Sequence, residues 1–250
     1  MKHYPFILFY LLCNVIIYAF HGSFWVYLLG FLVFSAVVIW GSFDIELGYF
    51  VNSKTHKRTK IKEVALTFDD GPTEFTPKFL DILKENQVKA TFFCIGKQIE
   101  KYPEIFQRII AEGHTVGNHT LSHSNNTGFL STSKMIEEIE KCDEIISKIG
   151  NITTNLYRPP FGVTNPNIAK AIKKTHKQSI GWNVRSLDTI IADEKKIYRR
   201  VTKDIKKGSI ILLHDTSEKT YNVLVDLLLF LKQKNYSTFT VDSIIKINKK

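Results

Sequence analysis

Short runs of apolar and β-branched residues alternate with longer amphipathic stretches along most of the chain. Seven of the short runs predict β-strands. They are Val64–Phe68, Lys89–Ile95, His114–Gly117, Asn155–Arg158, Ser179–Asn183, Ser209–His214 and Tyr236–Val241. Between them, apolar residues recur every three or four positions, which is typical of helices that cover a sheet. We expect these helices over residues 76–86, 98–112, 131–149, 165–175, 194–206 and 220–234.

The first of these helices carries its own start signal. Thr76 is the expected N-cap and Pro77 the expected first helical residue, and Phe79, Leu80 and Leu83 then fall on one face. Regular alternation of strand and helix favours a parallel sheet or barrel. In such folds the functional side chains gather where the strands end.

The N-terminal part of the chain follows another pattern, with no charged residue between His3 and Phe43. Residues 5–20 and 24–40 are apolar, and a turn signal, His21-Gly22-Ser23, separates them. One helix over both segments would be about 54 Å long, whereas the apolar core of a bilayer is about 30 Å thick. Two short membrane-spanning helices joined by a tight turn fit better.

The sequence therefore predicts three parts. Residues 1–42 form a transmembrane anchor that contacts lipid through residues 5–40, residues 43–62 form a linker, and residues 63–250 form the α/β domain. A cleaved signal peptide is the alternative for the first apolar segment, with Lys2 as its basic end, although no small-x-small cleavage site is clear.

Charge limits the partners of the protein. The 250 residues carry a net charge of +10, but the bases are interleaved with acids. The one basic cluster, around residues 56–60, comes without a nucleic-acid motif, so we expect no nucleic-acid partner. That cluster either contacts anionic lipid or belongs to a solvated linker. Three cysteines provide no disulfide framework.

Acidic and histidine residues follow two of the predicted strands. Asp69 and Asp70 come at the end of the first strand, just before a Gly-Pro turn. His119 and His123 follow the third strand, and their spacing puts them on one face of a helical turn. Two imidazoles and a carboxylate from another strand end suit zinc and leave a fourth position open. An acidic turn and two surface histidines are the simpler alternative.

Three more strand ends carry polar residues. Arg158 follows the fourth strand and can hold a carboxylate, and two prolines stiffen the loop after it. Asp188 follows the fifth strand and His214 the sixth. Taken singly, Arg158 could form a structural ion pair and His214 could be a core histidine. Five strand ends that carry polar residues in one sheet nevertheless indicate a reaction site.

The order of these motifs closely resembles the NodB-homology polysaccharide deacetylases, carbohydrate esterase family 4. The resemblance rests on Thr-Phe-Asp-Asp-Gly-Pro, His-Thr-x-x-His, Arg-Pro-Pro-Phe, a Trp-to-Asp segment and Leu-x-His, and covers about residues 63–245. It implies a distorted, incomplete (β/α)7 barrel, here preceded by the transmembrane helical hairpin. It also implies an N-deacetylase that releases acetate from N-acetylated amino-sugar polymers such as peptidoglycan, chitin-like polymers or exopolysaccharide.

Roles for nine residues follow from motif position in that family. The resemblance implies one divalent metal, usually Zn²⁺, bound by Asp70, His119 and His123. It makes Asp69 the general base and Arg158 the residue that orients it.

The same resemblance makes His214 the general acid, with Asp188 setting its charge. It gives the Leu212 side chain to the acetyl pocket and the backbone N–H of Phe161 to the oxyanion.

Two positions depart from the fourth family motif, which usually has the form Asp-x-x-Asp-Trp. Arg185 stands in place of its first Asp and Thr189 in place of its Trp, while Asp188 is kept. The change at Thr189 is expected to reshape the sugar groove rather than the reaction.

The usual substrates of the family lie outside the cytoplasm. The resemblance therefore implies a protein anchored in the cell (inner) membrane with its catalytic domain outside, although the bases between residues 54 and 62 favour the opposite orientation. The alternative functions are a catalytically inactive, membrane-anchored glycan-binding module and a metal-dependent phosphoesterase.

Overall fold

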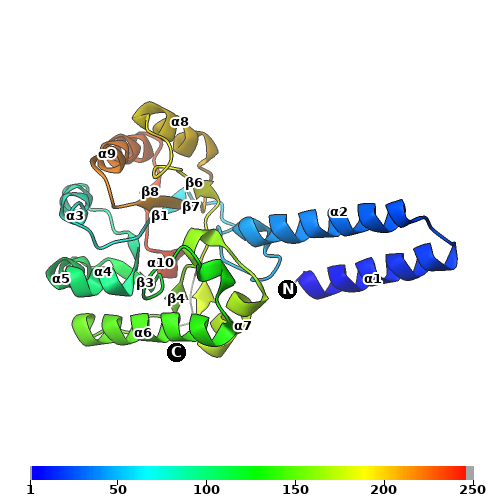
Figure 1. Ribbon diagram of the computed structural model, residues 1–250. Helices are drawn as coiled ribbons and strands as arrows, with labels where there is room; N and C mark the ends of the chain where they lie inside the picture. The colour runs from blue at the N-terminus through cyan, green and yellow to red at the C-terminus, as the bar shows by residue number, and fades with distance from the viewer. Residues whose placement is uncertain (1, 246–250) are drawn as a thin grey trace.

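Figure 1 shows the computed structural model, which describes residues 2–245, as a curled parallel sheet surrounded by helices, with two N-terminal helices projecting from it. The strands are β1 (Glu63–Asp69), β2 (Thr91–Cys94), β3 (Thr115–Asn118), β4 (Leu156–Tyr157), β5 (Gln178–Ser179), β6 (Val184–Arg185), β7 (Ile210–His214) and β8 (Ser237–Thr238). Their order is β5-β4-β3-β2-β1-β7-β6, and β8 pairs with the start of β1. Every pair of these strands is parallel.

The sheet curls into an incomplete barrel. Its two edge strands, β5 and β6, are separated in sequence only by residues 180–183. This stretch spans at most about 18 Å even when fully extended, so the two edges of the sheet lie close together. The single strand that we expected over Ser179–Asn183 is therefore two short strands, because the chain crosses there from one edge of the barrel to the other.

Side chains of β1 alternate between two cores. Val64, Leu66 and Phe68 pack outward against the helices, whereas Ala65 packs inside the barrel. Because successive residues of a strand point to opposite faces, Asp69 at the end of β1 also faces the inside. This alternation directs a carboxylate toward the interior of the barrel at the carboxyl end of the strand.

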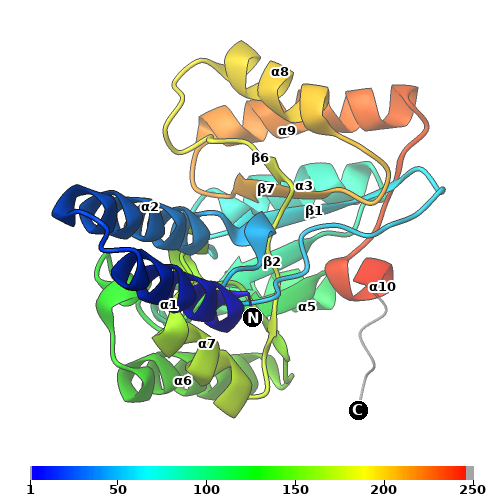
Figure 2. The same cartoon turned by 90° about the vertical axis from the view of Figure 1, so that its right-hand side faces the viewer.

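Eight helices of the described chain belong to the body. They are α3 (Thr76–Glu85), α4 (Gly96–Lys101), α5 (Pro103–Ala111), α6 (Thr132–Gly150), α7 (Pro166–Lys174), α8 (Glu194–Asp204), α9 (Glu218–Gln233) and α10 (Val241–Ile245). Short 3-10 turns occur at η1 (Ile45–Leu47), η2 (Thr127–Phe129) and η3 (Pro160–Gly162). Figure 2 shows α8 and α9 above β7, and α6 and α7 on the opposite side of the body.

Two details of the predicted helices were wrong. Pro103 begins a new helix, so the stretch 98–112 is two helices rather than one. Thr76 is not an N-cap but the first residue of α3, after Phe75. Its hydroxyl accepts a hydrogen bond from the Thr73 N–H and donates one to the buried carboxylate of Asp215, and these partners keep it from capping the helix.

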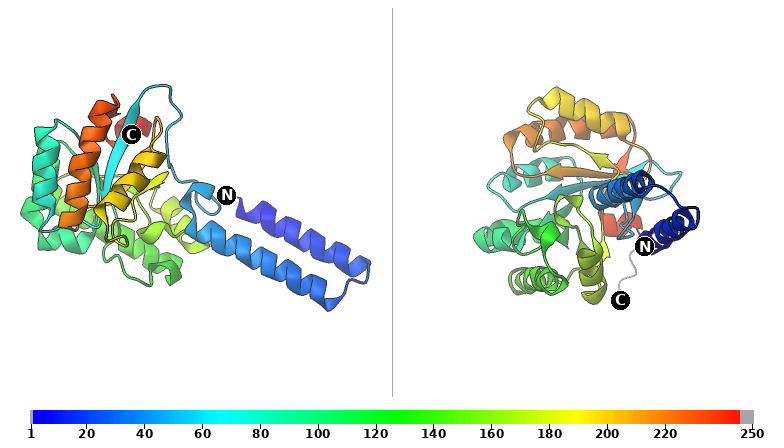
Figure 3. Two further views of the ribbon diagram at one scale, coloured as in Figure 1. Left: turned by 90° about the horizontal axis from the view of Figure 1, so that it is seen from above. Right: turned by 45° about the vertical axis from the view of Figure 1, so that its right-hand side comes forward.

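The two N-terminal helices, α1 (His3–Ala19) and α2 (Phe24–Phe43), lie side by side and antiparallel (Figures 1 and 3). Phe34 of α2 stacks on Phe6 and Tyr10 of α1. No residue of α1 is buried, and only Gly41 of α2 is. By length and composition α2 could cross a membrane, whereas α1 is a shorter apolar helix.

The segment after α2 lies against the body, although we expected a linker there. Ile45 is buried in the inner core, and Phe50 and Val51 pack among helices of the body. The Thr164 N–H donates a hydrogen bond to the carbonyl of Ser42 at the end of α2. These apolar side chains fix the segment because their burial removes them from water.

Burial of Ile45 provides a test of this packing. Replacing Ile45 with Ala should lower the free energy of unfolding by about 2–5 kcal/mol, because a buried isoleucine leaves a cavity. Thermal unfolding of the full chain in detergent measures the effect. Ile61→Ala is the matched control, since Ile61 is 63% exposed; equal stability of the two variants would contradict the packing.

Candidate active site

The polar residues found in the sequence meet at the carboxyl ends of the strands. Asp69 at the end of β1 pairs in register with His214 at the end of β7. Both line a cavity of about 200 Å³. Its full lining is Asp69, Asp70, His119, His123, Phe161, Trp182, Arg185, Leu187, Thr189, Leu212 and His214.

Asp70 reaches the same space as Asp69 through its backbone conformation. Neighbours on a strand normally point to opposite faces, but Asp70 has a φ of 73°. This left-handed turn brings its carboxylate toward the histidines. The next residue must be small, because a Cβ on Gly71 would come within 2.5 Å of the Asp215 carboxylate.

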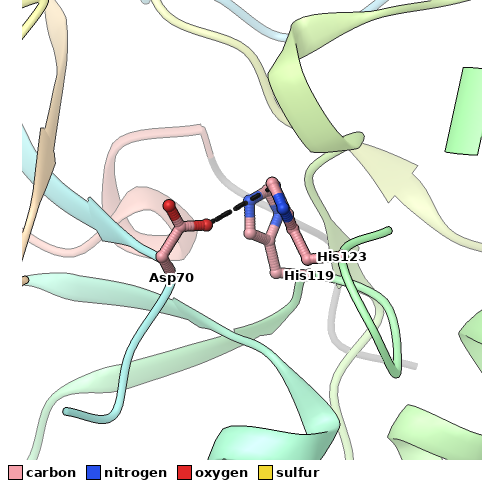
Figure 4. A group of neighbouring side chains, drawn as sticks. All are labelled: Asp70, His119 and His123. Atoms are coloured by element: carbon pink, nitrogen blue, oxygen red, sulfur yellow. Dashed lines mark ion pairs between the residues drawn. The ribbon is translucent and has the colours of Figure 1, made fainter. Parts of the chain in front are cut away.

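Asp70, His119 and His123 form a compact cluster (Figure 4). Asp70 Oδ1 lies 3.5 Å from His119 Nε2 and 3.4 Å from His123 Nε2. This oxygen is buried and has no hydrogen-bond partner among the described residues. A buried acceptor without a partner and two imidazole nitrogens directed at it fit a divalent cation.

The two histidines do not lie on a helical turn, as we expected, but on an irregular loop after β3. Thr120 and His123 have φ values of 69° and 47°. The Asn118 side-chain oxygen accepts the N–H of Thr120, and the Thr120 hydroxyl accepts the N–H of His123. The loop is therefore held by its own side chains.

The protonation states in the cluster also suit a cation. His119 Nδ1 lies 2.8 Å from the Arg158 carbonyl, which can only accept, so Nδ1 carries the proton and Nε2 is free. Burial, and then the neighbouring His119, lowers the pKa of His123 to about 4. Burial raises the pKa of Asp70, but the neighbouring histidines, His119 first, outweigh burial and lower it.

Arg158 lies fully buried inside the barrel beside Asp69. Its Nη1 donates to Asp69 Oδ1 at 2.6 Å and to the Thr67 hydroxyl at 2.8 Å. Its other nitrogens donate to the carbonyls of Ile180 and Gly181. The arginine therefore fixes one oxygen of Asp69 and leaves the other, Oδ2, 3.6 Å from His119 Nε2.

His214 is paired with a buried carboxylate. Its Nδ1 lies 2.7 Å from Asp188 Oδ1, and its backbone N–H donates to Asp188 Oδ2. Burial lowers the pKa of His214, but the hydrogen bond and charge of Asp188, followed by the charges of Asp69 and Asp70, raise it to about 9. The imidazolium form is thus present at neutral pH, with Nε2 directed toward Asp70 at 3.9 Å.

Phe161 and Leu212 take positions at the rim and the wall of the cavity. Phe161 has a φ of 60° in η3, and its ring centroid lies 4.6 Å from that of His123. Its backbone N–H makes none of the hydrogen bonds found within residues 2–245. Leu212 is buried in β7 and lines the cavity, as do Arg185 and Thr189.

Four residues that support the site were not predicted from the sequence. Ser186 and Thr220 donate hydrogen bonds to the Asp188 carboxylate, Thr67 binds Arg158, and Asp215 is buried beside the site. Thr67 lies two residues before Asp69 on the same strand face, so strand periodicity could have found it. Thr220 comes from a distant helix, and no local pattern marks it.

Comparison with known proteins agrees with this geometry. A family model described as polysaccharide deacetylase matches residues 56–180. A peptidoglycan-N-acetylglucosamine deacetylase of Bacillus cereus is 36% identical over 192 residues, which cover 75% of this chain and 70% of that protein. The peptidoglycan-N-acetylmuramic acid deacetylase PdaA of Bacillus subtilis is 33% identical, with 75% and 73% covered.

A solved structure has the same fold. The crystal structure of a peptidoglycan N-acetylglucosamine deacetylase superposes with a TM-score of 0.75 at 34% identity, covering 79% of this chain and 94% of that one. The chain therefore belongs to the NodB-homology polysaccharide deacetylases, carbohydrate esterase family 4. It is a hydrolase that acts on carbon–nitrogen bonds, and its substrate class is polysaccharide.

The pairing of His214 with Asp188 predicts a titration result. Asp188→Asn removes the charge that raises the pKa of His214 from its ordinary value of about 6.5, so this pKa should fall from about 9 toward that value. An NMR titration of the histidine ring protons measures it. Asp204→Asn, at an exposed position of α8, is the control; an unchanged pKa in Asp188→Asn would contradict the pairing.

Proposed function

We propose that this protein is a metal-dependent, membrane-anchored N-deacetylase of cell-wall glycan. It would hydrolyse the acetamido group of an N-acetylated amino sugar and release acetate. The observation that carries the proposal is one cavity in which a cluster suited to a cation lies between a buried carboxylate and a charged imidazole. These are Asp70, His119 and His123, with Asp69 and His214 on either side.

Asp70, His119 and His123 would hold the metal, and zinc suits two imidazoles and one carboxylate. When bound, such a cation lowers the pKa of water toward about 7 and polarises the substrate carbonyl. Two observations support this role: the imidazole nitrogens are directed at Asp70, and the buried Asp70 Oδ1 has no hydrogen-bond partner among the described residues.

Asp69 is the proposed general base, and Arg158 is the residue that positions it. Arg158 binds Oδ1 of Asp69, so Oδ2 is the oxygen that can accept the proton of the attacking water. The buried guanidinium keeps the carboxylate in one orientation, which general-base catalysis needs.

His214 is the proposed general acid. Amide hydrolysis ends with a proton on the departing nitrogen, because an amine leaves more easily than an amide anion. The ring is charged at neutral pH, and Asp188 holds Nδ1, so Nε2 is the atom that can donate this proton.

Phe161 and Leu212 would bind the acetyl group. The backbone N–H of Phe161 has no partner within the described residues and can donate to the developing oxyanion, an interaction worth about 3–4 kcal/mol in comparable enzymes. Leu212 offers an apolar wall to the acetyl methyl.

The substrate we propose is peptidoglycan. The relatives at 36% and 33% identity are named for deacetylation of its N-acetylglucosamine and its N-acetylmuramic acid, respectively. Thr189, where the family usually has tryptophan, is exposed and lines the cavity, so we expect it to change the shape of the sugar site.

We further propose that α1 and α2 form a transmembrane hairpin that anchors the catalytic domain outside the cytoplasm. Apart from Gly41, none of their residues is buried in the isolated chain, and lipid would cover the exposed apolar side chains. The anchor would include residues 1–42, and the buried residues that follow would join it to the domain without a free linker.

Two variants separate the base from the metal site. Asp69→Asn should lower acetate release from peptidoglycan by about 10²–10⁴-fold, because it removes proton transfer, while zinc stoichiometry stays that of the wild type. His123→Asn should lose both zinc and activity. His176→Asn is the matched control, because His123 and His176 share a positive φ, 47° and 54°.

Metal content by mass spectrometry and melting temperature are measured on the same samples. Full activity in Asp69→Asn would contradict the catalytic assignment. A wild-type chain that binds the glycan and releases no acetate would be the inactive binding module.

Fusions at the C-terminus test the topology. We expect alkaline phosphatase fused there to be active, because this enzyme matures outside the cytoplasm. A green fluorescent protein fused at the same place should not fluoresce, because it would be exported in unfolded form. The reverse pattern would place the domain in the cytoplasm and contradict a wall substrate.

A further inference from the structure

A second cavity, of about 230 Å³, adjoins the catalytic cavity. Its walls are Phe43, Asp44, Ile45, Glu46, Trp182 and Arg185. Trp182 and Arg185 also line the catalytic cavity, so the two cavities share a wall. The other wall is formed by the last residue of α2 and the three residues that follow it, which lie before the first family motif.

The polar groups of this cavity have unused hydrogen-bonding capacity. Arg185 is exposed, its guanidinium lies 5.6 Å from the centroid of the Trp182 ring, and no carboxylate of the described chain forms an ion pair with it. The Glu46 carboxylate makes no hydrogen bond or ion pair within residues 2–245, whereas its N–H donates to Asp44 Oδ1 at 3.0 Å. Asp44 Oδ2 accepts the indole N–H of Trp40 at 3.3 Å.

The balance of charge selects the kind of ligand. Two carboxylates and one guanidinium line the cavity, and the charge of Lys206 also acts on Glu46, so neither sign of charge dominates. A neutral ligand with many hydroxyl groups can use both kinds of group. Sugar hydroxyls donate to carboxylates and accept from guanidinium. Phe43, which is 65% exposed, and the edge of Trp182 add apolar surface for the face of a sugar ring.

The wall made by residues 43–46 is fixed to the body. Ile45 packs in the inner core with Ile180 and Trp182. A Cβ on Gly181 would come within 3.1 Å of Ile45, which shows how closely the segment approaches the strand crossing. A binding surface on such a support is preorganised.

We propose that this second cavity is a subsite for a neighbouring sugar of the same glycan chain, built by the end of α2 and the segment that follows it. The inference rests on the proposed function, because it takes the reacting sugar to lie in the catalytic cavity. Asp44 and Glu46 accept hydrogen bonds from sugar hydroxyls, and Arg185 donates at the junction of the two cavities. The glycan is thereby held next to the end of α2.

Chain length of the substrate provides the test. The full chain in detergent is assayed for acetate release from N-acetylglucosamine and from its tetramer, and for binding of the tetramer by calorimetry. The measured ratio is kcat/KM for the tetramer divided by kcat/KM for the monomer. Glu46→Ala and Phe43→Ala should each reduce this ratio by about tenfold, as expected for one lost charged hydrogen bond or one lost stacking contact. Each variant should weaken tetramer binding by a similar factor. Glu140→Ala, an exposed glutamate on α6, is the matched control and should retain the wild-type ratio.

The two readouts separate the subsite from the proposed function. An unchanged ratio and unchanged tetramer binding in both variants would overturn the subsite. If the wild type releases no acetate from either sugar or from peptidoglycan, the proposed function fails. The binding measurement then decides the subsite: weaker binding in the variants supports it, and equal binding overturns it.

Discussion

The buried ion pair between Arg158 and Asp69 is the interaction on which the site depends. Removing two charges from water costs several kcal/mol for each ion, and a pair offsets this only when its remaining donors are satisfied. Thr67 and the carbonyls of Ile180 and Gly181 take those donors. The pair therefore connects the ends of β1 and β4 to residues 180–183, which join the two edges of the barrel. Barrel closure and the orientation of the Asp69 carboxylate depend on the same hydrogen-bond network.

The same arginine also reaches the cation cluster through its backbone. The carbonyl of Arg158 accepts the Nδ1 proton of His119 and so directs Nε2 toward Asp70. On the opposite side, His214 is set by Asp188 and is paired in register with Asp69 across β1 and β7. The proposed base Asp69 and the proposed acid His214 thus lie at strand ends, whereas His119 and His123 lie on a loop held by the side chains of Asn118 and Thr120.

Strand ends were predictable from the sequence because apolar runs end sharply at Asp69 and His214, and because strand periodicity determines which face a side chain takes. The irregular loop of His119 and His123 was not, since their spacing is also that of a helical turn and only the positive φ values distinguish the two. The carbonyl partners of Arg158 lie more than twenty residues away, beyond any local pattern. Burial of Ile45 was missed for a similar reason, since it packs with Ile180 and Trp182, more than a hundred residues away along the chain.

The segment that follows α2 connects the two apolar helices to the proposed active site. Phe43 ends α2, and with the next three residues it lines a cavity that shares Trp182 and Arg185 with the proposed catalytic cavity. Catalytic domains can be attached to an anchor by a flexible tether, but here the chain leaves the helix and enters the core of the body at Ile45. The position of the second cavity relative to α2 is therefore fixed by packing.

Acetate release by the full chain, measured on peptidoglycan and on N-acetylglucosamine oligomers, tests the central claim most directly. The assay is run as purified, after treatment with a chelator, and after zinc is returned. The account predicts that release stops with the chelator and resumes with zinc. Release that is unaffected by chelation would contradict the role of Asp70, His119 and His123, and no release from either polymer by the zinc-loaded protein would contradict the deacetylase itself.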